Sequence, residues 1–186
     1  HRDLHSFPTR RSSDLTAILL RWLEMTDNER GFPLEDLIVL TAQTGDEFES
    51  TKKLVEAHIF PLLRKHRIRF VEIAKHGPST KDGYTVLQDT CNPYELHIEG
   101  DYKLSQQMHQ RGTIPALSGA HLCAIKWKGT VIDSWLHDHL FGQAFGPYLG
   151  YSAEETKRAE KCEEYKPLGQ GYRFPLIEWG DRKSVV

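Results

Sequence analysis

The chain has 186 residues, of which 39% are hydrophobic and 27% charged, with a formal net charge of -2. This composition is typical of one soluble globular domain, and no aliphatic run approaches the ~18–20 residues that cross a bilayer. The net charge gives no electrostatic case for nucleic-acid binding. Three widely spaced cysteines and the lack of an apolar leader predict a reducing, cytoplasmic compartment. They also argue against a disulfide framework and a zinc cluster.

Both ends of the sequence are unusual. Residues 5–15 (HSFPTRRSSDL) resemble one reading frame of a common short-read sequencing adapter. Residues 181–186 (DRKSVV) resemble the other strand of that adapter, whose next codon is a stop. Because both ends match, we treat residues 1–15 and 181–186 as adapter-like artefacts and exclude them from fold reasoning. The expected domain is therefore 16–180, a fragment cut by the edges of a sequence read.

The first half of this domain predicts two helices that alternate with two strands. Residues 16–25 place their apolar side chains on one helical face, and residues 34–43 have the β-rich centre of a buried parallel strand. A long helix is expected over 50–66, where Pro61 should kink or split it. Residues 68–77 alternate apolar and polar side chains and predict the second strand.

The second half predicts helices joined by irregular chain. Residues 78–120 are rich in Gly, Pro, Ser and Thr, with one short helix expected near 104–110. A helix within 123–140 has Val131 and Trp135 on its apolar face. Ser152 is the expected N-cap of a later polar helix. Strands separated by helices favour an α/β fold with a parallel sheet.

The stretch LTAQTGDEFEST (40–51) joins a strand to a helix through a tight turn at Thr44 and Gly45. Open α/β sheets bind ligands at the carboxyl ends of such strands, where glycine lets the backbone approach closely. Asp46 and Glu47 would also stabilise the following helix start through the macrodipole. The spacing alone favours an ordinary strand–turn–helix connection over a ligand site.

A thiol and two lysines lie close together in SGAHLCAIKWKG (118–129). Lys126 and Lys128 near a helix start would hold a phosphate or sulfate and favour the reactive thiolate of Cys123. The residues alone favour the alternative of a buried structural cysteine beside two solvated lysines. His137 and His139 diverge on a helix, which argues against a shared metal, so no metal site is predicted.

Taken in order, these segments resemble the phosphoadenylyl-sulfate (PAPS) reductase family, in the adenine nucleotide alpha-hydrolase-like (N-type ATP pyrophosphatase) superfamily. Its members carry a phosphate-gripping Ser-Gly-Gly-x-Asp-Ser loop after the first strand, followed by three later motifs. The chain is similar to the motif Thr-Gly-x-x-Phe-x-x-Thr at Thr44, Gly45, Phe48 and Thr51, to Cys-x-x-Lys-x-Lys at Cys123, Lys126 and Lys128, and to a late helix start at Gly150, Ser152 and Glu155. PLIEW (175–179) is similar to a Pro-Leu-x-x-Trp segment near the end of the family's domain.

The resemblance implies a doubly wound, mostly parallel, Rossmann-like sheet that here lacks the first strand and the phosphate loop. It implies a fragment of an oxidoreductase or transferase of sulfur metabolism that acts on a sulfonated or phosphorylated adenine nucleotide. Cys123 would be catalytic, and Lys126 and Lys128 would bind the phosphate or sulfonate. The residues expected to bind the nucleotide are Thr44, Gly45, Glu47, Phe48, Gly150 and Tyr151.

The same resemblance implies PAPS or ATP as substrate, with Mg²⁺ if ATP is used. A thioredoxin-like protein is the implied reductant, and neither a covalently bound cofactor nor an iron–sulfur cluster is expected. Glu49 stands where the family has proline, and Tyr151 stands where an arginine is common. The family's C-terminal cysteine motif is not seen, and Ser12, Ser13 and Asp14 receive no site role.

Two alternatives stay open. One is an ATP-pyrophosphatase-type adenylating or sulfur-transfer enzyme of RNA or DNA thiolation, the only hypothesis with a nucleic-acid partner. The other is a non-catalytic nucleotide-binding module. Because the phosphate loop is not in the sequence, we expect this chain by itself to be inactive.

Overall fold

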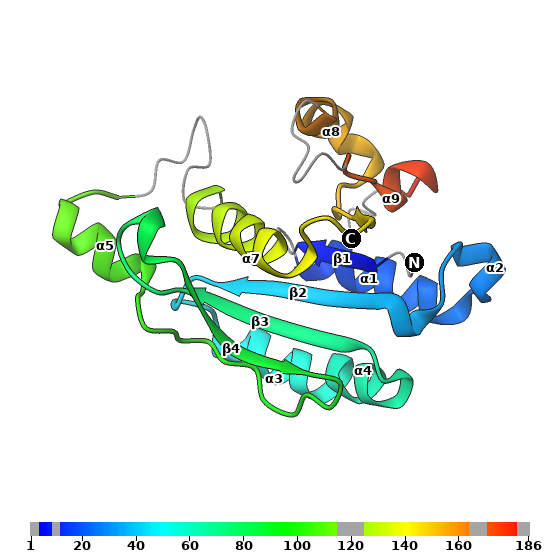
Figure 1. Cartoon of the computed structure of the whole chain (residues 1–186), viewed down its shortest axis with the longest axis horizontal. Helices are drawn as coiled ribbons and strands as arrows, with labels where there is room; N and C mark the ends of the chain where they lie inside the picture. Colours follow the sequence, from blue (N-terminus) through cyan, green and yellow to red (C-terminus); the bar gives the residue numbers. More distant parts are fainter. Residues whose placement is uncertain (1–3, 9–11, 115–124, 164–170, 182–186) are drawn as a thin grey trace.

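The computed structural model describes residues 4–8, 12–114, 125–163 and 171–181, and these form a mixed α/β fold around one sheet. The sheet has five strands in the order β4-β3-β2-β1-β5 (Figure 1). β2 pairs in parallel with β1 and β3, β1 pairs in parallel with β5, and β4 is antiparallel to β3. The strands are β1 (Leu4–Pro8), β2 (Leu37–Gln43), β3 (Arg69–Lys75), β4 (Tyr84–Thr90) and β5 (Phe145–Pro147).

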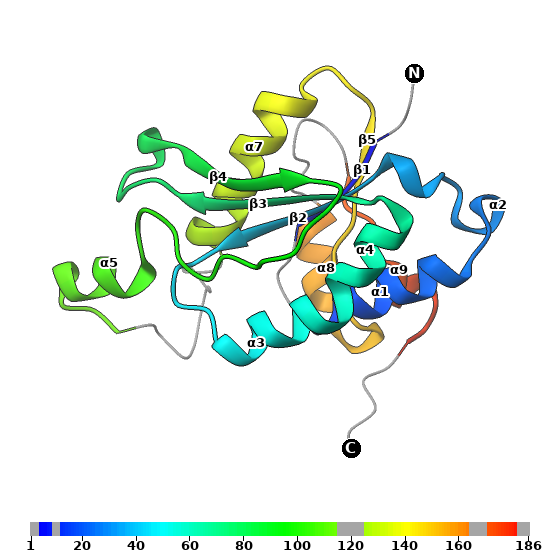
Figure 2. The same ribbon diagram turned by 90° about the horizontal axis from the view of Figure 1, so that it is seen from below.

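Helices cover both faces of this sheet. Figure 1 shows α7 (Thr130–Leu140) on one side and α3 (Glu49–Leu54) with α4 (Phe60–His66) on the other. In Figure 2, α1 (Ser12–Glu24) lies on the same side as α4. The remaining helices are α2 (Asp27–Arg30), α5 (Leu104–Arg111), α8 (Thr156–Glu163) and α9 (Pro175–Glu178), with single turns at Leu34–Asp36, Thr80–Asp82, Ile125–Gly129 and Ala153–Glu155.

The central strand β2 is apolar on both sides because each side meets a helical layer. Leu37 belongs to the core under α1 and α4, whereas Ile38 and Leu40 belong to the core under α7. Trp22 of α1 and Trp135 of α7 are buried in these two cores. The apolar faces predicted for both helices are therefore confirmed.

Pro61 divides the long helix as predicted. α3 ends at Leu54, a π-helical turn spans Val55–Ile59, and α4 begins at Phe60 with Pro61 in its first turn. Proline has no N–H to donate to the preceding turn, so the wider π turn accommodates the missing hydrogen bond. The short helix α5 and the pairing of Glu155 with the N-cap Ser152 are confirmed as well.

Part of the segment excluded from the expected domain takes part in the sheet. Residues 4–8 form β1 between β2 and β5, so the sheet does not lack a first strand. Without β1 both neighbours would expose unpaired backbone groups, and any extended segment can satisfy them because the pairing uses only the backbone. α1 also begins at Ser12, four residues before its expected start.

Two further strands were not predicted from the sequence. β4 lies at the edge of the sheet, and its side chains are only partly buried, so it lacks the apolar run of a central strand. β5 is short and contains glycine and proline, residues that are uncommon inside strands. β4 forms because it pairs with β3 across a turn, and β5 forms because it pairs with β1, which is distant in sequence.

The chain between β4 and α5, which we call the crossing segment (residues 91–103), returns across the face that carries α3 and α4 (Figure 2). Glu72 of β3 is fully buried and anchors it. The Glu72 Oε2 atom accepts hydrogen bonds from the His97 backbone N–H (3.1 Å) and from Gln88 Nε2 (2.6 Å), and His97 Nδ1 lies 2.9 Å away. Gln43 Nε2 donates to the Oε1 atom at 2.5 Å. This carboxylate therefore fixes the segment that leads to the candidate site.

Candidate functional site

The parallel strands bring their carboxyl ends to one edge of the sheet. The turn after β2, the start of α1 after β1 and the chain after β5 all lie at this edge. From β1 the chain proceeds to β2 on one side, whereas β5 pairs with the other side of β1. Open α/β sheets bind ligands at such a switch point.

The turn after β2 needs glycine at position 45. Gly45 has a φ of 82°, a backbone conformation that is unfavourable for other residues. A Cβ atom at this position would also lie 2.9 Å from Cγ of Lys103. The Thr44 carbonyl accepts a hydrogen bond from the Leu104 N–H at 2.9 Å, so the turn is packed directly on the start of α5.

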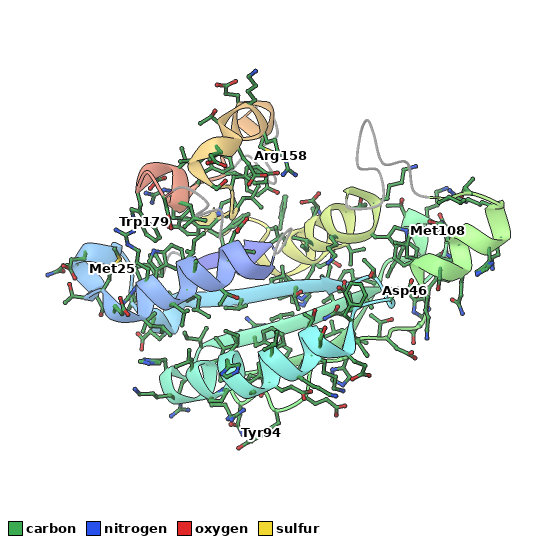
Figure 3. The ribbon with its side chains drawn as sticks, turned by 180° about the vertical axis from the view of Figure 1, so that it is seen from behind. Met25, Asp46, Tyr94, Met108, Arg158 and Trp179 are labelled. Carbon is green, nitrogen blue, oxygen red and sulfur yellow. The ribbon has the colours of Figure 1, made fainter. Side chains whose placement is uncertain are left out.

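Asp46 fastens the same turn to α5. Its two carboxylate oxygens accept hydrogen bonds from the backbone N–H and the hydroxyl of Ser105, each at 2.7 Å. Ser105 lies in the first turn of α5, where backbone N–H groups have no partner within the helix. Figure 3 shows Asp46 at the same end of the molecule as Met108 of α5. Asp46 therefore ties the turn after β2 to the first turn of α5.

Glu47 pairs with one of the two lysines that were expected to bind phosphate. The Lys128 Nζ atom lies 3.0 Å from Glu47 Oε1, which also accepts a hydrogen bond from the Thr44 hydroxyl at 3.1 Å. The pair is mostly buried, so Glu47 offsets the charge of Lys128. Lys126 is exposed. Phe48, just before α3, is 77% exposed and its ring is accessible for stacking on a ligand.

The predicted motif at Gly150, Ser152 and Glu155 lies on the other side of β1 from the Gly45 turn. A Cβ atom on Gly150 would be 3.0 Å from Cβ of Asp14 and 3.1 Å from the backbone N of Leu15, so Gly150 allows the chain after β5 to approach the start of α1. Tyr151 is only 3% exposed, and its ring stacks on Phe174 with centroids 5.6 Å apart. The Tyr151 ring therefore packs in a small core with Phe174.

The structure places the predicted nucleotide-binding residues along one edge of the sheet, but they do not all contact one another. Thr44, Gly45, Glu47 and Lys128 lie together, whereas Gly150 and Tyr151 lie beyond β1. Cys123 falls outside the described residues, so its catalytic role stays a prediction.

A group that the sequence analysis missed lies at the end of β3. Lys75 is only 6% exposed, and its ammonium group donates a hydrogen bond to the Pro78 carbonyl at 2.8 Å. The same nitrogen lies 5.1 Å and 5.9 Å from the ring centroids of Trp127 and Tyr102. Burial lowers the pKa of Lys75, and the nearby Arg111 lowers it further. Its place at the carboxyl end of a predicted strand was the signal that could have identified it.

A small pocket lies elsewhere, between α1, α2 and α9. Its volume is about 80 Å³, and the walls include Trp22, Tyr148, Arg173 and Trp179. Figure 3 shows Met25 and Trp179, two residues of this pocket, at the opposite end of the molecule from Asp46. None of the predicted site residues lines it.

Within the described ranges, no group of three or more His, Cys, Asp or Glu side chains is arranged to hold a metal ion. No helix in those ranges is both long and apolar enough to span a membrane. Comparison of the chain with family models, with curated proteins and with solved structures found no match.

Proposed function

We propose that the chain comes from a PAPS-reductase-like enzyme that acts on a sulfonated or phosphorylated adenine nucleotide. Its sheet would then be the Rossmann-like, doubly wound sheet of the adenine nucleotide alpha-hydrolase type. One observation carries the proposal: the Gly45 turn and the Gly150 approach to α1 lie at carboxyl ends on the two sides of β1. This is where an open α/β sheet binds a nucleotide.

Each part of the edge has a role in this proposal. The N-terminus of α1 faces the phosphates, where the positive end of the helix macrodipole favours an anion. The Gly45 turn and Phe48 contact the adenosine, and Lys126 contributes positive charge. Cys123, which lies outside the described residues, stays the sequence-predicted candidate for the thiolate. In the parent enzyme such a thiolate would attack the sulfonate sulfur and break its bond to the phosphate oxygen, which leaves with the nucleotide. A thioredoxin-like dithiol then releases sulfite from the cysteine and becomes a disulfide.

A second candidate is an enzyme that splits ATP at its α-phosphate to adenylate a substrate. The observation that favours it is Tyr151, which stands where an arginine is common in the sulfonucleotide enzymes. The Tyr151 ring is buried against Phe174 and provides no cation for a sulfonate. The products distinguish the candidates, because sulfite is released in the first reaction and pyrophosphate in the second.

Restoring the phosphate loop tests the shared part of both proposals. Asp14 already matches the aspartate of Ser-Gly-Gly-x-Asp-Ser when Thr16 and Ala17 are aligned with the residues that follow the loop. The variant is Arg10→Ser, Arg11→Gly and Ser12→Gly, with Leu15→Ser added in a second version because Leu15 is buried.

Titration calorimetry with PAPS and with ATP should give at least about tenfold tighter binding of one nucleotide to a loop variant than to the chain as given. A matched control adds Gly45→Ala to each loop variant, which strains the turn without touching the loop. If the control no longer binds the nucleotide more tightly than the chain as given, this result supports the Gly45 turn as part of the site. If neither folded loop variant gains affinity for PAPS or ATP, the proposal is wrong.

A further inference from the structure

Three cations lie near the carboxyl end of β3, and we call them the cation cluster (Lys75, Arg111 and Lys126). Lys126 is the chain neighbour of Trp127, whose ring centroid lies 5.1 Å from the Lys75 Nζ atom. Arg111 follows Gln110, which accepts a hydrogen bond at 3.2 Å from the hydroxyl of Tyr102, the other ring beside Lys75. Burial is the main cause that lowers the pKa of Lys75, the charges of Arg111 and Lys126 lower it further, and Asp82 raises it. None of the three side chains forms an ion pair with an acidic residue in the part of the chain that the structure describes.

Two stacked aromatic rings lie beside the ammonium group of Lys75. Trp127 and Tyr102 stack with ring centroids 5.3 Å apart and are themselves buried. Trp127 Nε1 donates to Gln107 of α5 at 3.0 Å, which fixes the stack against the helix. The ammonium group of Lys75 therefore lies beside two buried, stacked rings at the carboxyl end of β3.

The ammonium group of Lys75 has unused donors. A lysine ammonium carries three N–H donors, and here one neutral carbonyl, that of Pro78, accepts one of them. Buried lysines are rare unless they are paired, because burial of an uncompensated charge costs free energy. Repulsion from two further cations adds to this cost. An anion bound here would offset both the cost of burying the lysine charge and the repulsion between the cations. It would also accept charge-assisted hydrogen bonds.

The cation cluster adjoins the candidate site through the chain itself. Tyr102 precedes Lys103, whose side chain contacts Gly45, and Trp127 precedes Lys128, which pairs with Glu47. The cluster thus lies beside the turn expected to contact the adenosine.

We propose that the cation cluster binds the tetrahedral oxyanion of the substrate, the phosphate or sulfate group at the charged end of the nucleotide. This inference rests on the proposed function. It assigns the phosphate or sulfate group of the substrate to Lys75 rather than to Lys128. Glu47 already offsets the charge of Lys128, whereas Lys75 has no such partner among the described residues. Arg111 and Lys126 complete the charge that a multiply charged anion requires.

Binding of inorganic pyrophosphate and of sulfate tests the cluster without the nucleotide. The variant Lys75→Met keeps an unbranched side chain and removes the charge. Lys81→Met is the matched control, because Lys81 is an exposed lysine in the turn after β3. At low ionic strength, calorimetry should show at least about tenfold weaker pyrophosphate binding by Lys75→Met and less than about twofold change in the control. Lys75→Arg should retain more affinity than Lys75→Met.

The unfolding temperature of each variant is measured without ligand, so that lost binding is not mistaken for lost folding. Lys75→Met should melt at or above the temperature of the parent, because it relieves a buried charge. A folded Lys75→Met that binds pyrophosphate as tightly as the parent would overturn the inference, and so would equal losses in both variants.

The loop variants separate this inference from the proposed function. If a loop variant binds PAPS or ATP with unchanged affinity after Lys75→Met, the cluster is not the anion site, although the proposed function stands. If pyrophosphate binding depends on Lys75 while neither loop variant binds a nucleotide, the cluster is an anion site and the proposed function fails.

Discussion

Replacement of Glu72 is expected to release the crossing segment from the sheet. Glu72 has no solvent exposure and lies within hydrogen-bond distance of donors on Gln43, Gln88 and His97. These partners come from β2, β4 and the crossing segment, so one side chain ties three parts of the fold together. Tyr102 and Lys103 follow in the same segment. Loss of the anchor should therefore disturb the Gly45 turn as well as the stability of the domain.

The expected cost follows from the partners that lose their acceptor. In Glu72→Ala the buried donors are left without a carboxylate, and removal of one partner from a buried charged network costs about 3–5 kcal/mol in the free energy of unfolding. Glu72→Gln keeps the size of the side chain and one acceptor oxygen, so its cost should be about 1–2 kcal/mol. Glu99→Ala is the matched control, because Glu99 is an exposed carboxylate of the same segment that pairs with Lys103 at 2.7 Å. Its cost should stay below about 1 kcal/mol.

Urea unfolding followed by tryptophan fluorescence measures these differences. Amide hydrogen exchange gives a second measurement. In Glu72→Ala, the exchange rates of residues 95–103 should rise above those of the parent by more than the rates in the rest of the protein do. The reasoning is refuted if Glu72→Ala costs no more than Glu99→Ala, or if exchange rises equally throughout the protein and not first in this segment.

Three further predictions concern packing, proton binding and the turn. Gly100→Ala should cost about 1–3 kcal/mol in unfolding free energy, because the new Cβ would lie 2.5 Å from Cβ of Ala74. Adding Ala74→Gly should recover part of this loss, as a double-mutant cycle would show. Burial raises the pKa of Tyr84 to about 12. Its stabilising contribution is present below the unfolded pKa of about 10 and is lost as the pH rises toward 12, so Tyr84→Phe should remove one tyrosinate step near pH 12 from an absorbance titration. Asp46→Ala should cost about 1–2 kcal/mol and speed amide exchange at Ser105, and unchanged exchange there would contradict its role in holding α5.

The site was predicted in part. The glycine turn after β2 could be found from sequence because a strand, a glycine and a helix follow one another within a few residues. Glu47 and Lys128 are 81 positions apart, and their ion pair could not be inferred from either motif. The same holds for Tyr151, whose motif position suggested a ligand contact although its ring packs on Phe174.

The sequence by itself determined the central strands, the amphipathic helices and the break at Pro61, because each depends on the periodicity or covalent structure of neighbouring residues. Only the tertiary structure decided that residues 4–8 pair as β1, and that β4 and β5 become strands. Backbone pairing with a distant strand leaves little trace in local side-chain patterns. Tertiary structure likewise brought the stacked rings of Tyr102 and Trp127 to the Lys75 ammonium group, since residues far apart in the chain meet only when the sheet and helices place them at one edge.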